Sequence, residues 1–150
     1  MGLRLTLKNG EGVLLDLPLS EDEWSPATKE LVSRELAGSE ADLDALCEIC
    51  DFFSNKRRVL MLNHMVKDCN NSASFTDLLK VAVNPKYVSD LVNKSPSREL
   101  ILKEGRGYSL SRLGLGSFLL LSLATRKLLR ETDSTNDDDK SFEERKTVVR

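Results

Sequence analysis

The sequence predicts a mainly α-helical protein with a small amount of β-structure, and three observations support this fold class. Apolar residues recur at helical spacing in several segments of residues 25–94 and again in residues 111–130. Two short segments, within residues 3–17 and 101–110, instead carry strand and turn signals. The chain has 150 residues, of which 40% are hydrophobic and 31% charged, so it can form one compact core with accessory elements.

The chain is expected to begin with a β-hairpin. Residues 3–7 and 13–17 both alternate apolar and polar side chains, and Asn9-Gly10 between them is a strong hairpin signal. Two strands alone are marginally stable in water, so this hairpin must pack on its own domain or on a second subunit.

Two helices are expected to follow. Ser25-Pro26 opens a helix that stops at Gly38, because proline fits the first helical position and glycine ends helices. Ser39 with Asp42 resembles a capping box for the next helix.

Residues 54–82 are expected to form a longer and a shorter helix. The longer helix covers residues 56–66, and its inward side chains are those at the apolar positions Val59, Leu60, Leu62 and Met65. Ser74 caps the shorter helix, which covers residues 75–82.

A third helix and a hairpin complete this pattern. Asn84 is a good N-cap and Pro85 a good first residue for a helix over residues 84–94, in which Val88 and Val92 face inward. A glycine-flanked hairpin follows at residues 101–110. Helix, turn, helix and then a basic hairpin is the order of a winged helix-turn-helix, whose most common use is to grip duplex DNA. The third helix is then the candidate recognition helix.

Several motifs within residues 54–114 also resemble a known family. The motifs are Ser54-Asn55-Lys56-Arg57-Arg58-Val59-Leu60, Phe75-Thr76-Asp77-Leu78-Leu79, Asn84-Pro85-Lys86-Tyr87-Val88-Ser89 and Gly105-Arg106-Gly107-Tyr108-Ser109-Leu110 with Leu113-Gly114. Together they resemble an archaeal winged-helix regulator, similar to the wider group that includes the arsenical-resistance-operon repressors. The resemblance implies a dimeric, operator-binding transcription regulator.

The charge of the chain is divided by segment. Residues 1–53 hold 4 basic and 12 acidic side chains, whereas residues 54–113 hold 11 basic and 5 acidic ones. The remaining residues balance. Positive charge therefore coincides with the helix-turn-helix pattern, as DNA binding requires.

The candidate DNA contacts lie at the start of the first helix, on the recognition helix and at the hairpin tip: Lys56, Arg57, Arg58, Lys86, Tyr87, Ser89, Asn93, Lys94 and Arg106. The three cations at residues 56–58 either grip phosphates or solvate a helix start. Arg106, between two glycines, can reach a phosphate or a minor groove. Tyr87 either contacts DNA or packs its ring on a neighbouring helix.

Cys47 and Cys50 stand three residues apart on an expected helix and admit two interpretations. Thiolate pairs bind soft metal ions, but both residues lie on an apolar stripe with Leu46 and Phe53, which favours core packing. We therefore expect no metal site and no cofactor. Three cysteines without a signal peptide favour a reducing, cytoplasmic location, and no apolar run is long enough to cross a bilayer.

Catalysis has little support in the sequence. The single histidine, His64, lies in an apolar helix, and neither a glycine-rich phosphate loop nor a recognisable carboxylate pair is present. We therefore expect that the protein is not an enzyme.

A long helix capped by Ser111 is expected over residues 111–130, and its leucines cover much of its circumference. One face is expected to pack under the winged helix and another to pair with a second copy. The candidate dimer interface consists of Leu115, Phe118, Leu121 and Leu128.

The sequence thus predicts four segments: an accessory hairpin and helix (1–38), a DNA-binding winged helix (39–114), a dimerisation helix (115–131) and a disordered tail (132–150). The predicted function is sequence-specific binding of double-stranded DNA by a homodimeric transcription regulator, with no membrane association and an operator and small-molecule effector that the sequence does not name. The alternative is a winged-helix adaptor that binds other proteins and not DNA, because the same fold is used for DNA binding and for protein binding. Asp90 on the recognition helix and the acidic first 53 residues favour that alternative.

Overall fold

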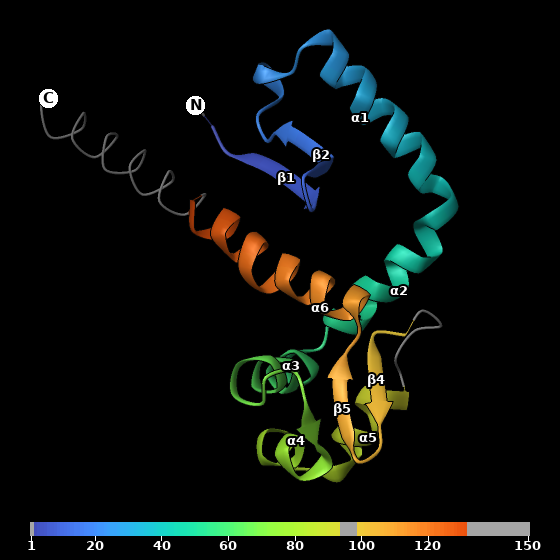
Figure 1. Ribbon diagram of the computed structural model, residues 1–150, viewed down its shortest axis with the longest axis vertical. Helices are drawn as coiled ribbons and strands as arrows, with labels where there is room; N and C mark the ends of the chain where they lie inside the picture. Colours follow the sequence, from blue (N-terminus) through green and yellow to red (C-terminus); the bar gives the residue numbers. More distant parts are fainter. Residues whose placement is uncertain (1, 94–98, 132–150) are drawn as a thin grey trace, which may run out of the picture. The chain divides into compact units, whose positions relative to one another are not determined.

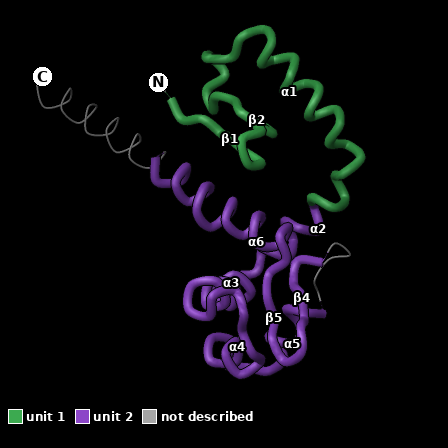
Figure 2. The backbone as a smooth tube through the Cα atoms, viewed as in Figure 1, with its two compact units in different colours: residues 1–46 green, residues 47–150 purple. Residues whose placement is uncertain are grey.

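The computed structural model describes residues 2–93 and 99–131 and divides the chain into two compact units, Met1–Leu46 and Cys47–Arg150 (Figure 2). The described residues are mainly helical, with short antiparallel strands, so the predicted mainly α class with a small β component is confirmed. Lys94 and the predicted tail at residues 132–150 lie outside the described residues.

Unit 1 begins with the predicted hairpin. Strands β1 (Arg4–Asn9) and β2 (Gly12–Pro18) pair in antiparallel fashion, and Gly10 adopts a φ of 60° in the turn that joins them. A left-handed φ is accessible to glycine at little cost, which is why Asn-Gly forms such turns. After a 3-10 turn at Glu21–Glu23, the Trp24 indole N–H donates to the Pro18 carbonyl at 2.8 Å.

Helix α1 (Pro26–Ser39) starts where the sequence predicts, because the Ser25 hydroxyl accepts the Thr28 backbone N–H. No residue of α1 is buried. The predicted capping box at Ser39 is wrong: Ser39 is the last residue of α1, and its hydroxyl donates to the Leu36 carbonyl. Because this local bond occupies the hydroxyl, a 3-10 turn at Glu40–Asp42 connects α1 directly to α2 (Leu43–Phe53).

Unit 2 combines three helices with a small sheet before its last helix (Figure 1). The elements are α3 (Lys56–Asp68), β3 (Ala73–Ser74), α4 (Phe75–Ala82), α5 (Pro85–Asn93), β4 (Ile101–Glu104) and β5 (Gly107–Leu110). The three strands form one antiparallel sheet in the order β3-β5-β4. The two-residue strand β3 is too short to be recognised from an alternating pattern.

Side-chain caps set the starts of these helices. The Asn55 side chain accepts the backbone N–H groups of Arg57 and Arg58 at the start of α3. A reciprocal capping box between Ser74 and Asp77 opens α4. At the start of α5, the Asn84 side chain accepts the Lys86 N–H at 2.9 Å. The predicted starts of all three helices are confirmed.

The hydrophobic core lies in unit 2. Its buried residues are Phe52, Phe53, Met61, Leu62, Met65, Ala73, Leu78, Ala82, Val88, Leu91, Leu100, Ile101, Leu110 and Phe118. One inward position on α3 differs from the prediction, since Leu60 is 44% exposed and Met61 is buried in its place. Contacts in this core hold α3, α4, α5 and strands β4 and β5 together.

The last helix continues to residue 131, as predicted, and is called the C-terminal helix below. It consists of α6 (Arg112–Leu119), a π-helical turn at Leu120–Thr125 and residues 126–131. Ser111 caps it by accepting the Gly114 N–H at 3.0 Å. Phe118 belongs to the core of unit 2, which corrects its assignment to a dimer interface.

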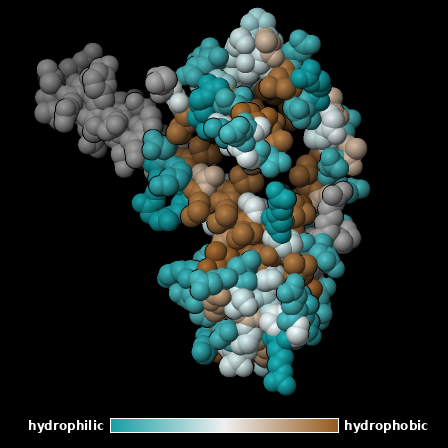
Figure 3. Space-filling model, in the orientation of Figure 1, coloured by the Kyte–Doolittle hydropathy of each residue, from teal (hydrophilic) through white to brown (hydrophobic). Residues whose placement is uncertain are grey.

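The rest of the C-terminal helix is poorly covered by its own chain. No residue of the π-helical turn is buried. The exposed leucines are Leu119, Leu120, Leu121, Leu123, Leu128 and Leu129. Leu115 is partly buried against the core, so Leu121 and Leu128 are the exposed members of the four predicted interface residues. Figure 3 shows hydrophobic side chains gathered at the surface over this helix.

Candidate nucleic-acid interface

Helix α5 presents the predicted polar residues to solvent. Val88 and Leu91 are fully buried and fix the helix against the core. Lys86, Ser89 and Asn93 are exposed. A helix with one anchored apolar face and an exposed polar face can reach a partner without changing its own packing.

The starts of α3 and α5 are joined by a cation–π contact. The Arg57 guanidinium carbon lies 4.1 Å from the centre of the Tyr87 ring. This contact lies well within the roughly 6 Å at which such pairs attract. Tyr87 is half-buried and packs against the core, so its ring serves as a support for Arg57 and matches the packing alternative raised from the sequence. Lys56 and Lys86, next to these two residues in the chain, are exposed.

Arg58 does not belong to this exposed group. Its Nη1 donates to the Phe52 carbonyl at 3.3 Å, and its guanidinium carbon lies 5.6 Å from the Phe52 ring centre. The guanidinium therefore ties the start of α3 to the end of α2. Arg58 thus has a structural role, and the contact of Arg58 with phosphate stays a prediction.

The hairpin of β4 and β5 carries a second cationic position. Gly105 has a φ of 58°, and the neighbouring Arg106 is exposed at the tip. Lys103 Nζ lies 5.9 Å from the Tyr108 ring centre on the same hairpin. Arg106 thus projects from a tight turn, as predicted.

Asn71 supports this hairpin and was not recognised from the sequence. Its side chain accepts the Leu110 N–H at 2.8 Å and donates to the Leu110 carbonyl at 3.2 Å. Both Asn70 and Asn71 have positive φ, at 51° and 57°. The only signal for this feature is the Asn-Asn pair, since asparagine tolerates the left-handed region and bonds to nearby backbone.

The other cations among the described residues of 54–113 lie on several elements. Lys67 lies near the end of α3, Lys80 on α4 with Asp77 at 3.9 Å, and Arg112 at the start of α6. Only some of the basic residues among residues 54–113 are therefore exposed on α5, at the start of α3 or on the hairpin.

Cys47 and Cys50 are both exposed, so the prediction of core packing is wrong. The apolar stripe of α2 is buried at Phe52 and Phe53, and the earlier turns, with Leu43 and Leu46, remain at the surface. Burial, with the nearby carboxylates of Asp77 and Asp68, raises the pKa of the Cys69 thiol. Within residues 2–93 and 99–131, no three His, Cys, Asp or Glu side chains gather as a metal site.

Comparisons with protein-family models, with curated proteins and with solved structures find no match to this chain. Among the described helices, none combines the length and apolar character needed to span a membrane.

Proposed function

We propose that unit 2 is a winged helix-turn-helix and that the protein is a sequence-specific DNA-binding transcription regulator. The observation that carries the proposal is the element order α3-β3-α4-α5-β4-β5 with the sheet order β3-β5-β4. In this arrangement α5 is the recognition helix and the β4–β5 hairpin is the wing.

The exposed side chains give these elements separate roles. Lys86, Ser89 and Asn93 on α5 are suited to base edges in a major groove, where lysine and asparagine read guanine and adenine. Arg57, held by the Tyr87 ring, and Arg106 at the hairpin tip are suited to phosphates. The excess of basic residues in residues 54–113 supplies the sequence-independent part of the affinity.

We further propose that the regulator is a homodimer. Burying one leucine is worth roughly 1.5–3 kcal/mol relative to exposure, so a helix with several exposed leucines gains stability from a partner. Of the interface residues predicted from the sequence we keep Leu128, which is 40% exposed, and we add Leu120, which is 51% exposed on the same helix. A two-fold dimer would place two copies of α5 on two half-sites of one operator.

The test is binding to duplex DNA selected from genomic fragments, measured against salt concentration. The logarithm of the affinity should fall with the logarithm of salt by about 0.9 per phosphate contacted. Arg106→Ala should weaken binding to all duplexes equally. Lys86→Ala and Asn93→Ala should cost roughly 1–3 kcal/mol on the selected site and little on random DNA.

Lys127→Ala is the matched control, because it removes one exposed positive charge from the C-terminal helix and should leave both affinities unchanged. Equal losses on selected and random DNA for Lys86→Ala and Asn93→Ala would show that α5 reads no bases.

A protein-binding adaptor is the second candidate. Asp90 on α5 and the 12 acidic residues among residues 1–53 favour it, because carboxylates repel phosphates. Absence of duplex affinity even at low salt would reject the DNA-binding proposal in favour of this one.

A further inference from the structure

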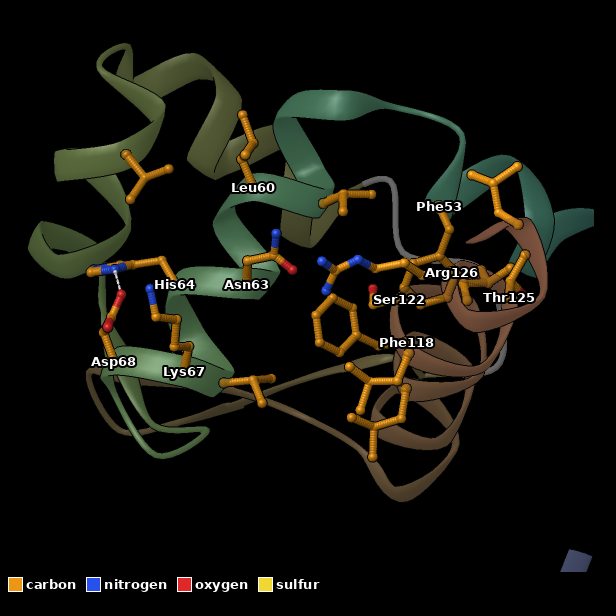
Figure 4. Close-up of a pocket in the computed structure, with 17 residues that line it drawn as sticks. Phe53, Leu60, Asn63, His64, Lys67, Asp68, Phe118, Ser122, Thr125 and Arg126 are labelled. Carbon is orange, nitrogen blue, oxygen red and sulfur yellow. Dashed lines mark hydrogen bonds and ion pairs between the residues drawn. The ribbon is translucent and has the colours of Figure 1, made fainter. Parts of the chain in front are cut away.

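A groove of about 1070 Å³ lies in unit 2 between α3 and the C-terminal helix (Figure 4). Its apolar lining includes Val59, Leu60, Val66, Phe118, Leu121 and Leu129. Small-molecule sites typically enclose roughly 300–1,000 Å³ and are lined mainly by apolar side chains with a few polar groups. The volume of the groove is close to the upper end of this range, and its lining is mainly apolar.

A cation faces this apolar lining. Figure 4 shows the Arg126 guanidinium extending into the groove toward Asn63 on α3. Among the described residues, no carboxylate lies within 4.0 Å of Arg126. Asp68, which lines the groove at the end where His64 lies, is bound to His64 Nδ1 at 2.9 Å. Arg126 thus offers a guanidinium that an anionic ligand would neutralise.

The wall that carries Arg126 is irregular. Leu121, Ser122 and Thr125 line the groove from the π-helical turn, where the Thr125 hydroxyl donates to the Leu120 carbonyl at 3.0 Å. Single π-helical turns are rare and frequently occur at functional sites. The small side chain of Ser122 leaves room beside Phe118 at the centre of the groove.

The charge of the C-terminal helix argues against a second copy of this helix as the occupant. Residues 112–131 contain four basic residues and one acidic residue, Glu131, at the end of the helix. Pairing two such helices across the groove would bring mainly cations toward Arg126, and like charges at close range repel. Leu120 and Leu128, the residues proposed for the dimer contact, do not line the groove.

We propose that this groove binds an amphipathic carboxylate, a molecule with one carboxylate and an extended alkyl chain. The carboxylate pairs with the Arg126 guanidinium, which matches its planar geometry, and accepts from the Asn63 amide. The alkyl chain lies along Phe118, Leu121 and Leu129. The site would function whether or not the chain binds DNA.

The test is calorimetric titration of the full chain with decanoate and with decanol, which has the same alkyl chain but no charge. Arg126→Met should lower the decanoate affinity by about ten- to a hundredfold, as loss of a charged hydrogen-bond partner does, and leave the decanol affinity unchanged. Lys127→Met is the matched control: it removes the neighbouring charge, does not line the groove and should bind decanoate normally.

Ser122→Phe fills the centre of the groove and should abolish binding of both probes while circular dichroism shows a folded chain. Equal loss of decanoate affinity in Arg126→Met and Lys127→Met would overturn the proposal, because it would indicate nonspecific attraction to a basic helix. Absence of binding by the wild-type chain, with a dimer that Ser122→Phe dissociates, would also overturn it and would assign the groove to a second copy. Because no DNA is present, these outcomes do not depend on the proposed regulator function.

Discussion

The two units of this chain use apolar residues in opposite ways. Among the described residues, the fourteen that form the hydrophobic core all lie in unit 2, between Phe52 and Phe118. In the described part of unit 1 the larger apolar side chains are at most partly buried, and five of them are more than half exposed: Leu3, Leu7, Val13, Leu14 and Leu36. Similar apolar patterns therefore lead to burial in one unit and to exposure in the other.

The difference lies in how many elements meet. In unit 2, helices α3, α4 and α5, parts of α2 and α6 and the three-stranded sheet contribute to one core, so their apolar faces have neighbours. Unit 1 offers a two-stranded sheet and one longer helix, and few apolar faces can be covered. Polar contacts, such as the 3.1 Å pair of Arg4 with Asp16, contribute little at exposed positions. An amphipathic pattern thus predicts an element but not its burial.

Truncation of one leucine in each unit should show this contrast most strongly. Leu78→Ala removes a fully buried side chain from α4 and should cost roughly 2–5 kcal/mol of unfolding free energy. Leu36→Ala, at a position 63% exposed on α1, should cost less than about 0.5 kcal/mol. Urea denaturation measures both values. Comparable losses would mean that α1 is buried in solution.

Two glycines on α6 test how tightly unit 2 is packed. A Cβ on Gly114 would collide with the Leu100 carbonyl oxygen, so Gly114→Ala should destabilise by roughly 1–3 kcal/mol. A Cβ on Gly116 meets nothing within 4 Å, so Gly116→Ala should stabilise by about 0.5–1 kcal/mol through helix propensity. Thermal unfolding compares the two variants, and a stabilised Gly114→Ala would contradict this packing.

One carboxylate in each unit is expected to contribute differently to stability: Asp77 in unit 2 and Asp16 in unit 1. The Ser74 backbone N–H bonded to the Asp77 carboxylate holds the pKa of Asp77 below its ordinary value of 3.8. Its contribution to stability is therefore complete above pH 3.8 and is lost as the pH falls through the lowered folded-state pKa. Asp77→Asn should flatten this part of the stability profile. Asp16→Asn in unit 1 should change stability by less than about 1 kcal/mol, since its ion pair is exposed.

The smallest expected difference is in the rates at which the three cysteines are alkylated. Cys47 and Cys50 are exposed on α2, where the chain passes from one unit to the other, and should react readily with iodoacetamide. Burial raises the pKa of Cys69, so less of its reactive thiolate is present at neutral pH. Mass spectrometry of the folded protein should show Cys69 modified last. Equal rates would place Cys69 at the surface.

Elements with a local signal were predictable from the sequence. Asn9-Gly10 predicts the first hairpin, and the caps at Asn55, Ser74 and Asn84 predict the starts of α3, α4 and α5. These signals are readable because they act on backbone groups only a few residues away.

Features set by distant neighbours were not predictable. The contact of Arg57 with Tyr87 and the bond of Arg58 to Phe52 decide which of two adjacent arginines is available to a partner. Exposure of Cys47 depends on which elements cover α2, and a capping or periodicity signal carries no such information.

The π-helical turn at Leu120–Thr125 bears on how the C-terminal helix can change in evolution. An i→i+5 turn accommodates one residue more than an α-helical turn, and each α-helical residue rotates the chain by about 100°. Loss of one residue within this turn would restore a regular α-helix and leave the faces of residues 126–131 in place. The same loss within Arg112–Leu119 would rotate every later side chain by about 100° relative to the core. Deletions should therefore be tolerated at the turn and selected against before it.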